Sequence, residues 1–188
     1  MRRRELLAGL LGGGALLGGG AIVMTGVPSI TSEELPESND SVEVDALEAR
    51  GSDPGSTTVP YDEQLTVLTF FATTCESCAE KMPNLVDTQS ELSAEPVQFV
   101  SVTAEPIGRG VSESEVVEWF ESRGGDWTLA HDPNSDLTVT YDGIPYPKTA
   151  AVDPDGRIWW EHTGYTSTDD LVAGIEGALE DASEHIDS

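Results

Sequence analysis

The stretch Leu65-Thr-Val-Leu-Thr-Phe-Phe-Ala-Thr-Thr-Cys75-Glu-Ser-Cys78-Ala-Glu-Lys-Met-Pro83 decides the fold. Residues 65–71 are apolar or β-branched and are followed by a short Thr-rich turn, which predicts a strand buried on both faces of a parallel sheet. The chain's only two cysteines then open a helical pattern. Thiols at the start of a helix suit redox chemistry, because unpaired N–H groups and the helix dipole stabilise the reactive thiolate.

Strand and helix patterns alternate along the rest of the chain. Apolar and β-branched runs predict further strands at 42–47, 97–102, 127–131, 149–152 and 157–162. Helices are predicted after Cys75, after the capping box that Ser112 opens, and after Ser167, with a helical turn at 136–141. Turn-forming residues fill 51–60, where we expect a loop. This order predicts an α/β fold in one domain.

The chain is strongly acidic, with 35 acidic residues, nine basic residues and a formal charge of -26. Removing residues 1–27 takes away three arginines and Glu5, which leaves six basic and 34 acidic residues and a charge of -28. Such a surface repels nucleic acid and anionic lipid, so neither is expected as a partner. The composition favours adaptation to high salt, with an ordinary solvated acidic face as the alternative.

The N-terminus has the pattern of an export segment. Arg3-Arg4-Glu-Leu-Leu precedes an uncharged stretch at 6–27, which resembles a twin-arginine signal, although Arg2 stands where a small polar residue is usual. An ordinary membrane helix is the alternative, weakened by the glycine triplets at 12–14 and 18–20. With no clean cleavage site, an uncleaved anchor is favoured over release, and the body of the protein is expected outside the cytoplasm.

These patterns divide the chain into four parts. They are a twin-arginine-type signal or membrane anchor (1–27), an acidic flexible linker (28–41), a folded domain (42–182) and an acidic tail (183–188).

Three features together resemble the thioredoxin superfamily. The two cysteines follow a buried strand, Pro83 stands five residues after Cys78, and a later segment reads Pro147-Lys-Thr-Ala-Ala-Val-Asp-Pro-Asp-Gly156. They look like the membrane-tethered TlpA/ResA-like thiol-disulfide oxidoreductases, whose P-T-T-x-x-I-D-x-D-G signature lies at the same offset. The resemblance covers about 42–181 and implies a thioredoxin fold, with a central mixed β-sheet flanked by helices on both faces.

The resemblance also implies roles for particular residues. Cys75 is the exposed attacking thiol and Cys78 the buried resolving thiol, which exchange disulfides through a mixed-disulfide intermediate. Pro147 is the cis-proline placed opposite the active cysteine, and Tyr146 before it is expected to contact substrate. Pro145 is a competing candidate, but only Pro147 has the family's register to the later D-x-D-G residues.

Two positions depart from the family pattern. Thr74 replaces the aromatic residue that usually precedes the first cysteine, which leaves its expected contact with substrate less apolar. Thr69 stands where many thioredoxins keep a buried acid that relays protons, and Glu76 is the candidate replacement. A carboxylate beside the Cys75 thiolate should raise its pKa, which favours a reductant over a strong oxidant. Alternatively, Glu76 is a solvated acid at the helix start.

Other uses of the cysteine pair are less well supported. A purely structural disulfide closing so short a loop constrains the unfolded chain little. Zinc requires four ligands, and the three histidines stand singly. A copper-binding metallochaperone is the main alternative, since thiolates suit Cu(I), although such carriers resemble a C-x-x-x-C pattern. Ala72 replaces the threonine expected of a peroxiredoxin. We therefore predict no cofactor and no metal.

The combined prediction is an extracytoplasmic thiol-disulfide oxidoreductase that works in the reducing direction. Its expected partners are exported proteins with disulfides and a membrane thiol donor, and it is expected to be a monomer attached to the membrane through its N-terminal segment.

Overall fold

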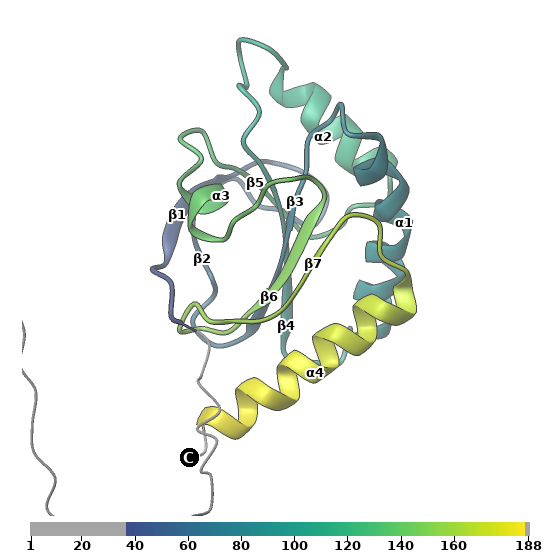
Figure 1. Cartoon of the computed structure of the whole chain (residues 1–188). Helices are drawn as coiled ribbons and strands as arrows, with labels where there is room; N and C mark the ends of the chain where they lie inside the picture. Colours follow the sequence, from purple (N-terminus) through teal and green to yellow (C-terminus); the bar gives the residue numbers. More distant parts are fainter. Residues whose placement is uncertain (1–36, 187–188) are drawn as a thin grey trace, which may run out of the picture. The chain divides into compact units, whose positions relative to one another are not determined.

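Seven strands form one mixed sheet in the computed structural model, which describes residues 37–186 (Figure 1). The predicted export segment at 1–27 lies outside the described residues, as do most of the predicted linker and the last two residues of the predicted tail. Within 37–186, every helix is too short or too polar to be a candidate for crossing a bilayer.

The elements follow the predicted alternation of strands and helices. In chain order they are β1 (Val42–Ala46), β2 (Gly55–Val59), β3 (Leu65–Phe70), α1 (Glu76–Glu91), β4 (Val97–Thr103), α2 (Glu113–Ser122), β5 (Thr128–His131), α3 (Asp136–Thr140), β6 (Lys148–Val152), β7 (Ile158–Thr163) and α4 (Thr168–Ile186).

The strand order in the sheet is β2-β1-β5-β4-β3-β6-β7. β3 pairs in parallel with β4, and β4 with β5, whereas the β1–β2, β1–β5, β3–β6 and β6–β7 pairs are antiparallel. All six residues of β3 are buried, as expected for a strand covered on both faces. The prediction of a central mixed sheet is confirmed.

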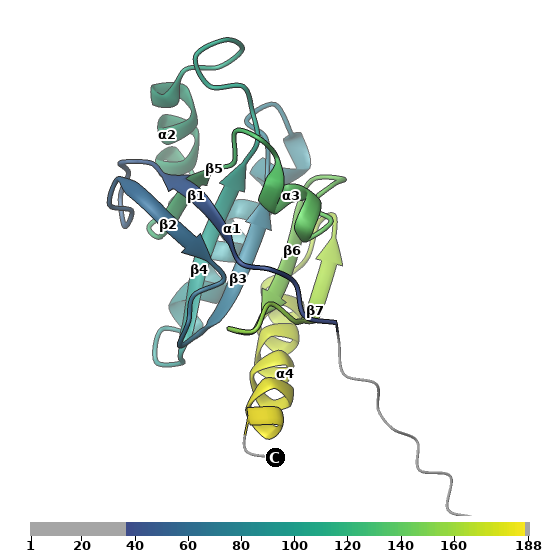
Figure 2. The same cartoon turned by 90° about the vertical axis from the view of Figure 1, so that its left-hand side faces the viewer.

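Helices cover the two faces unequally. Buried residues of α1, α2 and α4 share one core cluster with Val67 and Ala151 of the sheet. On the opposite face, α3 and the β1–β2 hairpin share a second cluster with Leu68 and Ala150. Figure 1 shows the sheet nearly edge-on between these two layers, and Figure 2 shows α1 behind it and α3 in front. Alternate residues of β3 and β6 therefore face different layers.

The prediction of a loop throughout 51–60 is wrong, because β2 occupies Gly55–Val59. Thr57, Thr58 and Val59 pair with β1 in register, with Val42 opposite Val59. Pairing with β1 and burial of Val59 outweigh the local preference of Gly and Ser for turns.

The sheet brings three loops to one edge. β3 and β4 are parallel, so the loop that carries Cys75 and the loop that follows Thr103 leave the sheet at the same end. β6 runs in the opposite direction and begins there, with Lys148 paired to Phe70. Pro147, directly before Lys148, is thus placed beside the β3–α1 connection.

Candidate active site

Cys75 is the N-cap residue of α1 and is partly exposed. Its sulfur accepts a hydrogen bond from the backbone N–H of Cys78 at 3.2 Å, and the Ser77 hydroxyl lies 3.5 Å away. This N–H of the first helical turn thus points toward the sulfur, where it would stabilise negative charge on a thiolate, as would the helix dipole.

Cys78 lies on the first turn of α1, where only 3% of its surface is exposed, and it contributes to the core cluster between α1 and the sheet. The two sulfurs form a disulfide, with Cα atoms 5.2 Å apart. The pair therefore combines one partly exposed and one buried cysteine.

Two cis prolines precede β6, since both the Ile144–Pro145 and the Tyr146–Pro147 bonds are cis. The strand register distinguishes Pro147 from Pro145. Only Pro147 directly precedes Lys148, which pairs with Phe70 at the end of β3. Its carbonyl accepts a hydrogen bond from Gly164 N–H at 2.7 Å. Tyr146 is half-buried and packs against both core clusters.

Glu105, which follows β4, holds the turn before the cysteines. One of its carboxylate oxygens accepts from the Thr73 backbone N–H at 2.7 Å and the other from the Thr73 hydroxyl at 2.8 Å. Burial raises the pKa of the Tyr146 phenol, and the negative charges of Glu105 and Asp132 raise it further. The Glu105 carboxylate therefore acts on both residues: it accepts hydrogen bonds from Thr73 and helps to raise the pKa of Tyr146.

We expect Glu105→Ala to lower the free energy of unfolding by about 2–3 kcal/mol, because hydrogen bonds to a charged acceptor are lost and the half-buried Thr73 N–H loses its partner. Urea unfolding at neutral pH measures this loss. Glu95→Ala removes an exposed carboxylate and should change stability by less than about 0.5 kcal/mol. Equal effects of the two variants would show that Glu105 does not hold the turn.

The remaining predicted residues lie around the cysteines. Thr74 and Glu76 are exposed on either side of Cys75, and Glu76 occupies the first turn of α1. Their predicted roles, contact with substrate for Thr74 and acid chemistry for Glu76, stay predictions. Thr69 is buried, and its hydroxyl lies 3.2 Å from that of Thr149 on β6. A neutral pair of hydroxyl groups thus occupies the position where many thioredoxins keep a buried acid.

Lys81 is fully buried on α1, three residues after Cys78. Its ammonium donates to the Gly164 carbonyl at 3.3 Å, and no carboxylate in residues 37–186 forms an ion pair with it. Burial lowers the pKa of Lys81 to about 8. A lysine in this state exchanges its proton in the pH range in which thiols ionise.

The lowered pKa predicts a stability that rises with pH. Above about pH 8 the folded state releases the Lys81 proton, whereas the unfolded chain holds it up to the ordinary pKa of 10.5. The unfolded state binds more protons over this interval, so the free energy of unfolding should gain roughly 3 kcal/mol from Lys81.

Urea unfolding of the oxidised wild type and of Lys81→Met, at several pH values from 7 to about 10.5, tests this expectation. The wild type should gain stability relative to Lys81→Met as pH rises, while contributions from tyrosines cancel in the difference. If the free energies of unfolding of the wild type and of Lys81→Met changed in parallel with pH, the lowered pKa of Lys81 would be contradicted.

Sequence reasoning missed both Glu105 and Lys81. Each had a usable signal. Glu105 closely follows the second strand of a strand–helix–strand pattern, which favours parallel pairing and would bring the loops after both strands to the same edge of the sheet. Lys81 is one of only two lysines in the chain and interrupts the apolar face of a predicted helix.

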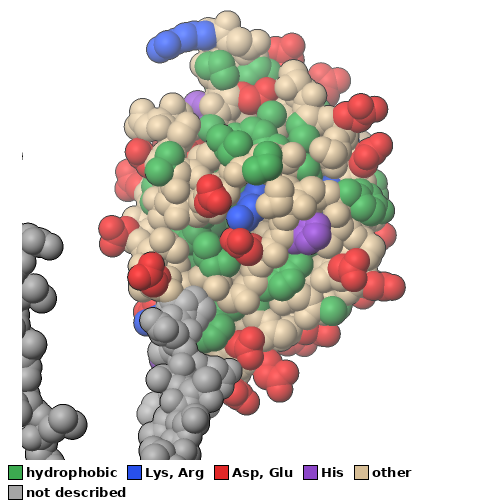
Figure 3. Space-filling model, viewed as in Figure 1, with side chains coloured by type: hydrophobic (Ala, Val, Ile, Leu, Met, Phe, Trp, Pro, Cys, Tyr) green, Lys and Arg blue, Asp and Glu red, His purple; other side chains and the backbone are tan. Residues whose placement is uncertain are grey.

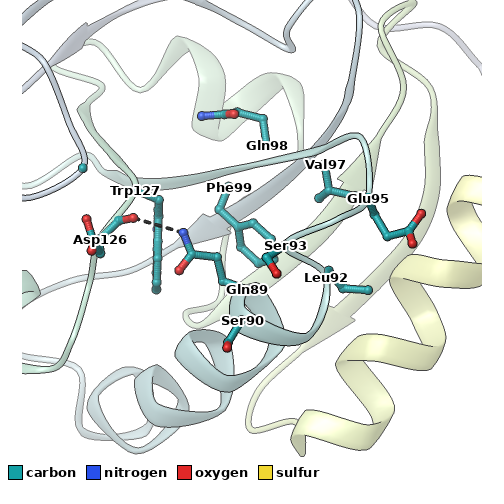
Figure 4. A pocket seen from close by; sticks show the side chains of 11 residues that line it. Gln89, Ser90, Leu92, Ser93, Glu95, Val97, Gln98, Phe99, Asp126 and Trp127 are labelled. Atoms are coloured by element: carbon teal, nitrogen blue, oxygen red, sulfur yellow. Dashed lines mark hydrogen bonds between the residues drawn. The ribbon is translucent and has the colours of Figure 1, made fainter.

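A polar cavity of about 460 Å³ lies at the far end of α1, between that helix end, the start of β4 and Trp127 (Figure 4). Gln89 donates to the Asp126 carbonyl across it at 3.0 Å. Since α1 has 16 residues, this cavity lies on the order of 20 Å from Cys75. Among residues 37–186, no group of three or more His, Cys, Asp or Glu side chains is arranged to hold a metal ion.

Comparison with known proteins gives consistent matches. A model of the family described as Redoxin matches residues 27–179. The thiol-disulfide oxidoreductase ResA of Bacillus subtilis is 26% identical over 105 residues, which cover 56% of this chain and 55% of ResA. ResA of Oceanobacillus iheyensis is 27% identical over 127 residues, which cover 68% of this chain and 55% of that protein. The chain thus spans little more than half the length of these relatives.

Among solved structures, StoA from Bacillus subtilis resembles the chain with a TM-score of 0.60 at 17% identity, covering 73% of this chain and 98% of StoA. This likeness confirms the thioredoxin-like fold. Because the family model matches most of its length, the chain belongs to the Redoxin family, as a ResA-like member of the thioredoxin superfamily.

Proposed function

We propose that this chain is an extracytoplasmic thiol-disulfide oxidoreductase that reduces disulfides in exported proteins. The observation that carries the proposal is the disulfide between Cys75, a partly exposed residue at the start of α1, and the buried Cys78. The name shared by the two ResA relatives supports the same chemistry.

The reaction proceeds in two exchanges. In the reduced chain, the Cys75 thiolate attacks a substrate disulfide, forms a mixed disulfide and releases one substrate thiolate. Cys78 then attacks the Cys75 sulfur, which closes the Cys75–Cys78 bond and releases the second substrate thiolate. Two electrons pass to the substrate, and the chain ends in the disulfide form that the structure contains.

The preference for reduction rests on Glu76. Its exposed carboxylate directly follows Cys75 and would raise the pKa of that thiol, against the effect of the helix start. A higher thiol pKa disfavours the reduced thiolate, so the reduced chain gives up its electrons more readily.

Exposed apolar residues near the Pro147 loop offer a place for a substrate chain. Ile144 and Tyr165 are 60% and 57% exposed. Ile144 precedes the cis-proline segment, and Tyr165 follows Gly164, which is hydrogen-bonded to Pro147. Figure 3 shows hydrophobic side chains dispersed over one face, with most of the acidic side chains around its rim. We propose that Thr74, Tyr146 and Pro147 meet the substrate here.

We further propose the cellular setting predicted from the sequence. The segment 1–27 acts as a twin-arginine-type signal and stays as an anchor, the linker 28–41 separates it from the domain, and a membrane thiol carrier supplies electrons. The acidic surface suits a monomer working at high salt.

Trapping with Cys78→Ser tests the function. This variant can form a mixed disulfide through Cys75 but cannot resolve it, so specific exported proteins should become covalently attached and be released by reductant. The matched control is the double variant Cys75→Ser/Cys78→Ser, which should trap nothing.

A copper-carrying function predicts the opposite pattern. No adducts would form with Cys78→Ser, and the reduced wild-type chain would hold stoichiometric Cu(I) through both thiolates. That combination would replace the proposed exchange reaction with metal delivery.

A further inference from the structure

Both lysines of this sequence are buried, although the protein is otherwise poor in basic residues. Lys148 is 4% exposed and forms a 2.8 Å ion pair with Glu161. Lys81 has no exposed surface, and its hydrogen bond goes to a neutral carbonyl. A buried ammonium that forms no ion pair within residues 37–186 is costly to fold, so its presence suggests a role other than stability.

Lys81 lies on the same face of α1 as Cys78. It stands three residues after Cys78 on the same helix, a spacing that brings Cβ atoms to about 5–6 Å on one helix face. Both side chains are buried on the side of α1 turned toward the protein interior. The side chains of Lys81 and Cys78 therefore start from neighbouring positions on the buried face of α1.

The amine also lies at the junction of α1 and the proline loop. Gly164 accepts from the Lys81 ammonium through its carbonyl at 3.3 Å and donates through its N–H to the Pro147 carbonyl at 2.7 Å. Gly164 has φ of +94°, a conformation that residues with a side chain rarely adopt. This glycine joins the lysine to the loop beside which the substrate is proposed to lie.

Burial is the cause of the lowered pKa of Lys81. The charged and titratable groups on the neighbouring helices and strands are solvent-exposed or lie on the opposite face of the sheet. They include Glu76 and Glu80 on α1, Glu161 and His162 on β7, Tyr165 after it, Asp169 and Asp170 on α4, and Lys148 on β6.

Resolution of the mixed disulfide requires Cys78 to lose a proton. Burial disfavours the thiolate, so a nearby proton acceptor is needed. An ammonium at Lys81 would attract the Cys78 thiolate and so offset part of the cost of burying that charge.

We propose that Lys81 accepts the proton of Cys78 during resolution and holds the resulting thiolate as an ion pair. This inference rests on the proposed exchange function. The neutral amine becomes an ammonium as Cys78 becomes a thiolate. The thiolate forms the bond to Cys75 and breaks the bond between Cys75 and the substrate, whose sulfur leaves with the electron pair and takes up a proton from the ammonium or from water.

The first test measures the Cys78 thiol alone, in full-length Cys75→Ser. The chemical shift of its Cβ, followed by NMR against pH, gives the pKa without any exchange reaction. Adding Lys81→Met should raise that pKa by at least about one unit, since a cationic neighbour is lost. The control is Lys148→Met, which removes the same charge from the other face of the sheet. It should shift the pKa of the Cys78 thiol by less than about 0.3 units.

The second test follows resolution of a mixed disulfide between Cys75 and a model peptide. Release should be at least about tenfold slower at pH 7 in Lys81→Met than in the wild type, with the inflection of the pH profile moved upward. Lys81→Gln keeps a donor for the Gly164 carbonyl but cannot titrate, so it should behave like Lys81→Met.

The outcomes separate the two proposals. If the wild type fails to release the peptide, the exchange function is wrong whatever Lys81 does. If the wild type releases it and Lys81→Gln keeps the wild-type pH profile, Lys81 is structural and this inference is overturned. Folding of the variants is expected, because replacing a buried charge by a neutral side chain of similar size is often neutral or stabilising.

Discussion

Cys75→Ser is expected to lower the rate of dithiothreitol-dependent insulin reduction by at least about 1,000-fold, to the uncatalysed rate. Cys75 provides the accessible sulfur, and its position at the N-cap of α1 is the feature that would activate it. A serine hydroxyl at the same place ionises far less readily and cannot form a disulfide. Insulin turbidity in high-salt buffer measures the rate.

Cys78→Ser is the matched comparison, since it removes the other sulfur but keeps the attacking one. Reduced beforehand and assayed without dithiothreitol, it should react with one equivalent of insulin disulfide and then stop as an adduct, whereas Cys75→Ser should not react at all. Sustained turnover by Cys75→Ser would mean that Cys78, despite being 3% exposed, can act alone.

Phe71→Ala should lower the free energy of unfolding by about 3–5 kcal/mol. Phe71 directly follows β3 and is 2% exposed, and its ring stacks on Trp119 of α2 with centroids 4.7 Å apart. Truncation removes buried apolar surface and leaves a cavity between the sheet and α2. Denaturant unfolding of the oxidised protein measures the loss.

Val139→Ala provides the control for Phe71→Ala. Val139 is 78% exposed on α3, so its truncation should change stability by less than about 0.5 kcal/mol. A loss below about 1 kcal/mol in Phe71→Ala would show that the contact between Phe71 and Trp119 contributes little.

The fold could be predicted where local patterns and tertiary structure agree. The continuous apolar run of β3 and the capping box at Ser112 define their elements without reference to distant residues, and both predictions are confirmed. β2 was missed because its register depends on β1 and its residues favour turns when read alone.

The candidate site was only partly predictable for a related reason. Cys75 and Cys78 are neighbours in sequence, and a motif carries their spacing. Glu105 and Lys81 belong to no motif: one reaches Thr73 across 32 residues and the other reaches Gly164 across 83. Such contacts arise from sheet topology and helix packing, which a single sequence specifies only indirectly.

A single-turnover exchange tests the central claim most directly. The full-length chain is reduced, freed of reductant, mixed with excess oxidised insulin, quenched with acid and alkylated, and thiols on both proteins are counted by mass spectrometry. The account predicts that Cys75 and Cys78 lose their thiols together while insulin gains an equal number. Persistence of both cysteines as thiols beside unchanged insulin disulfides would contradict it.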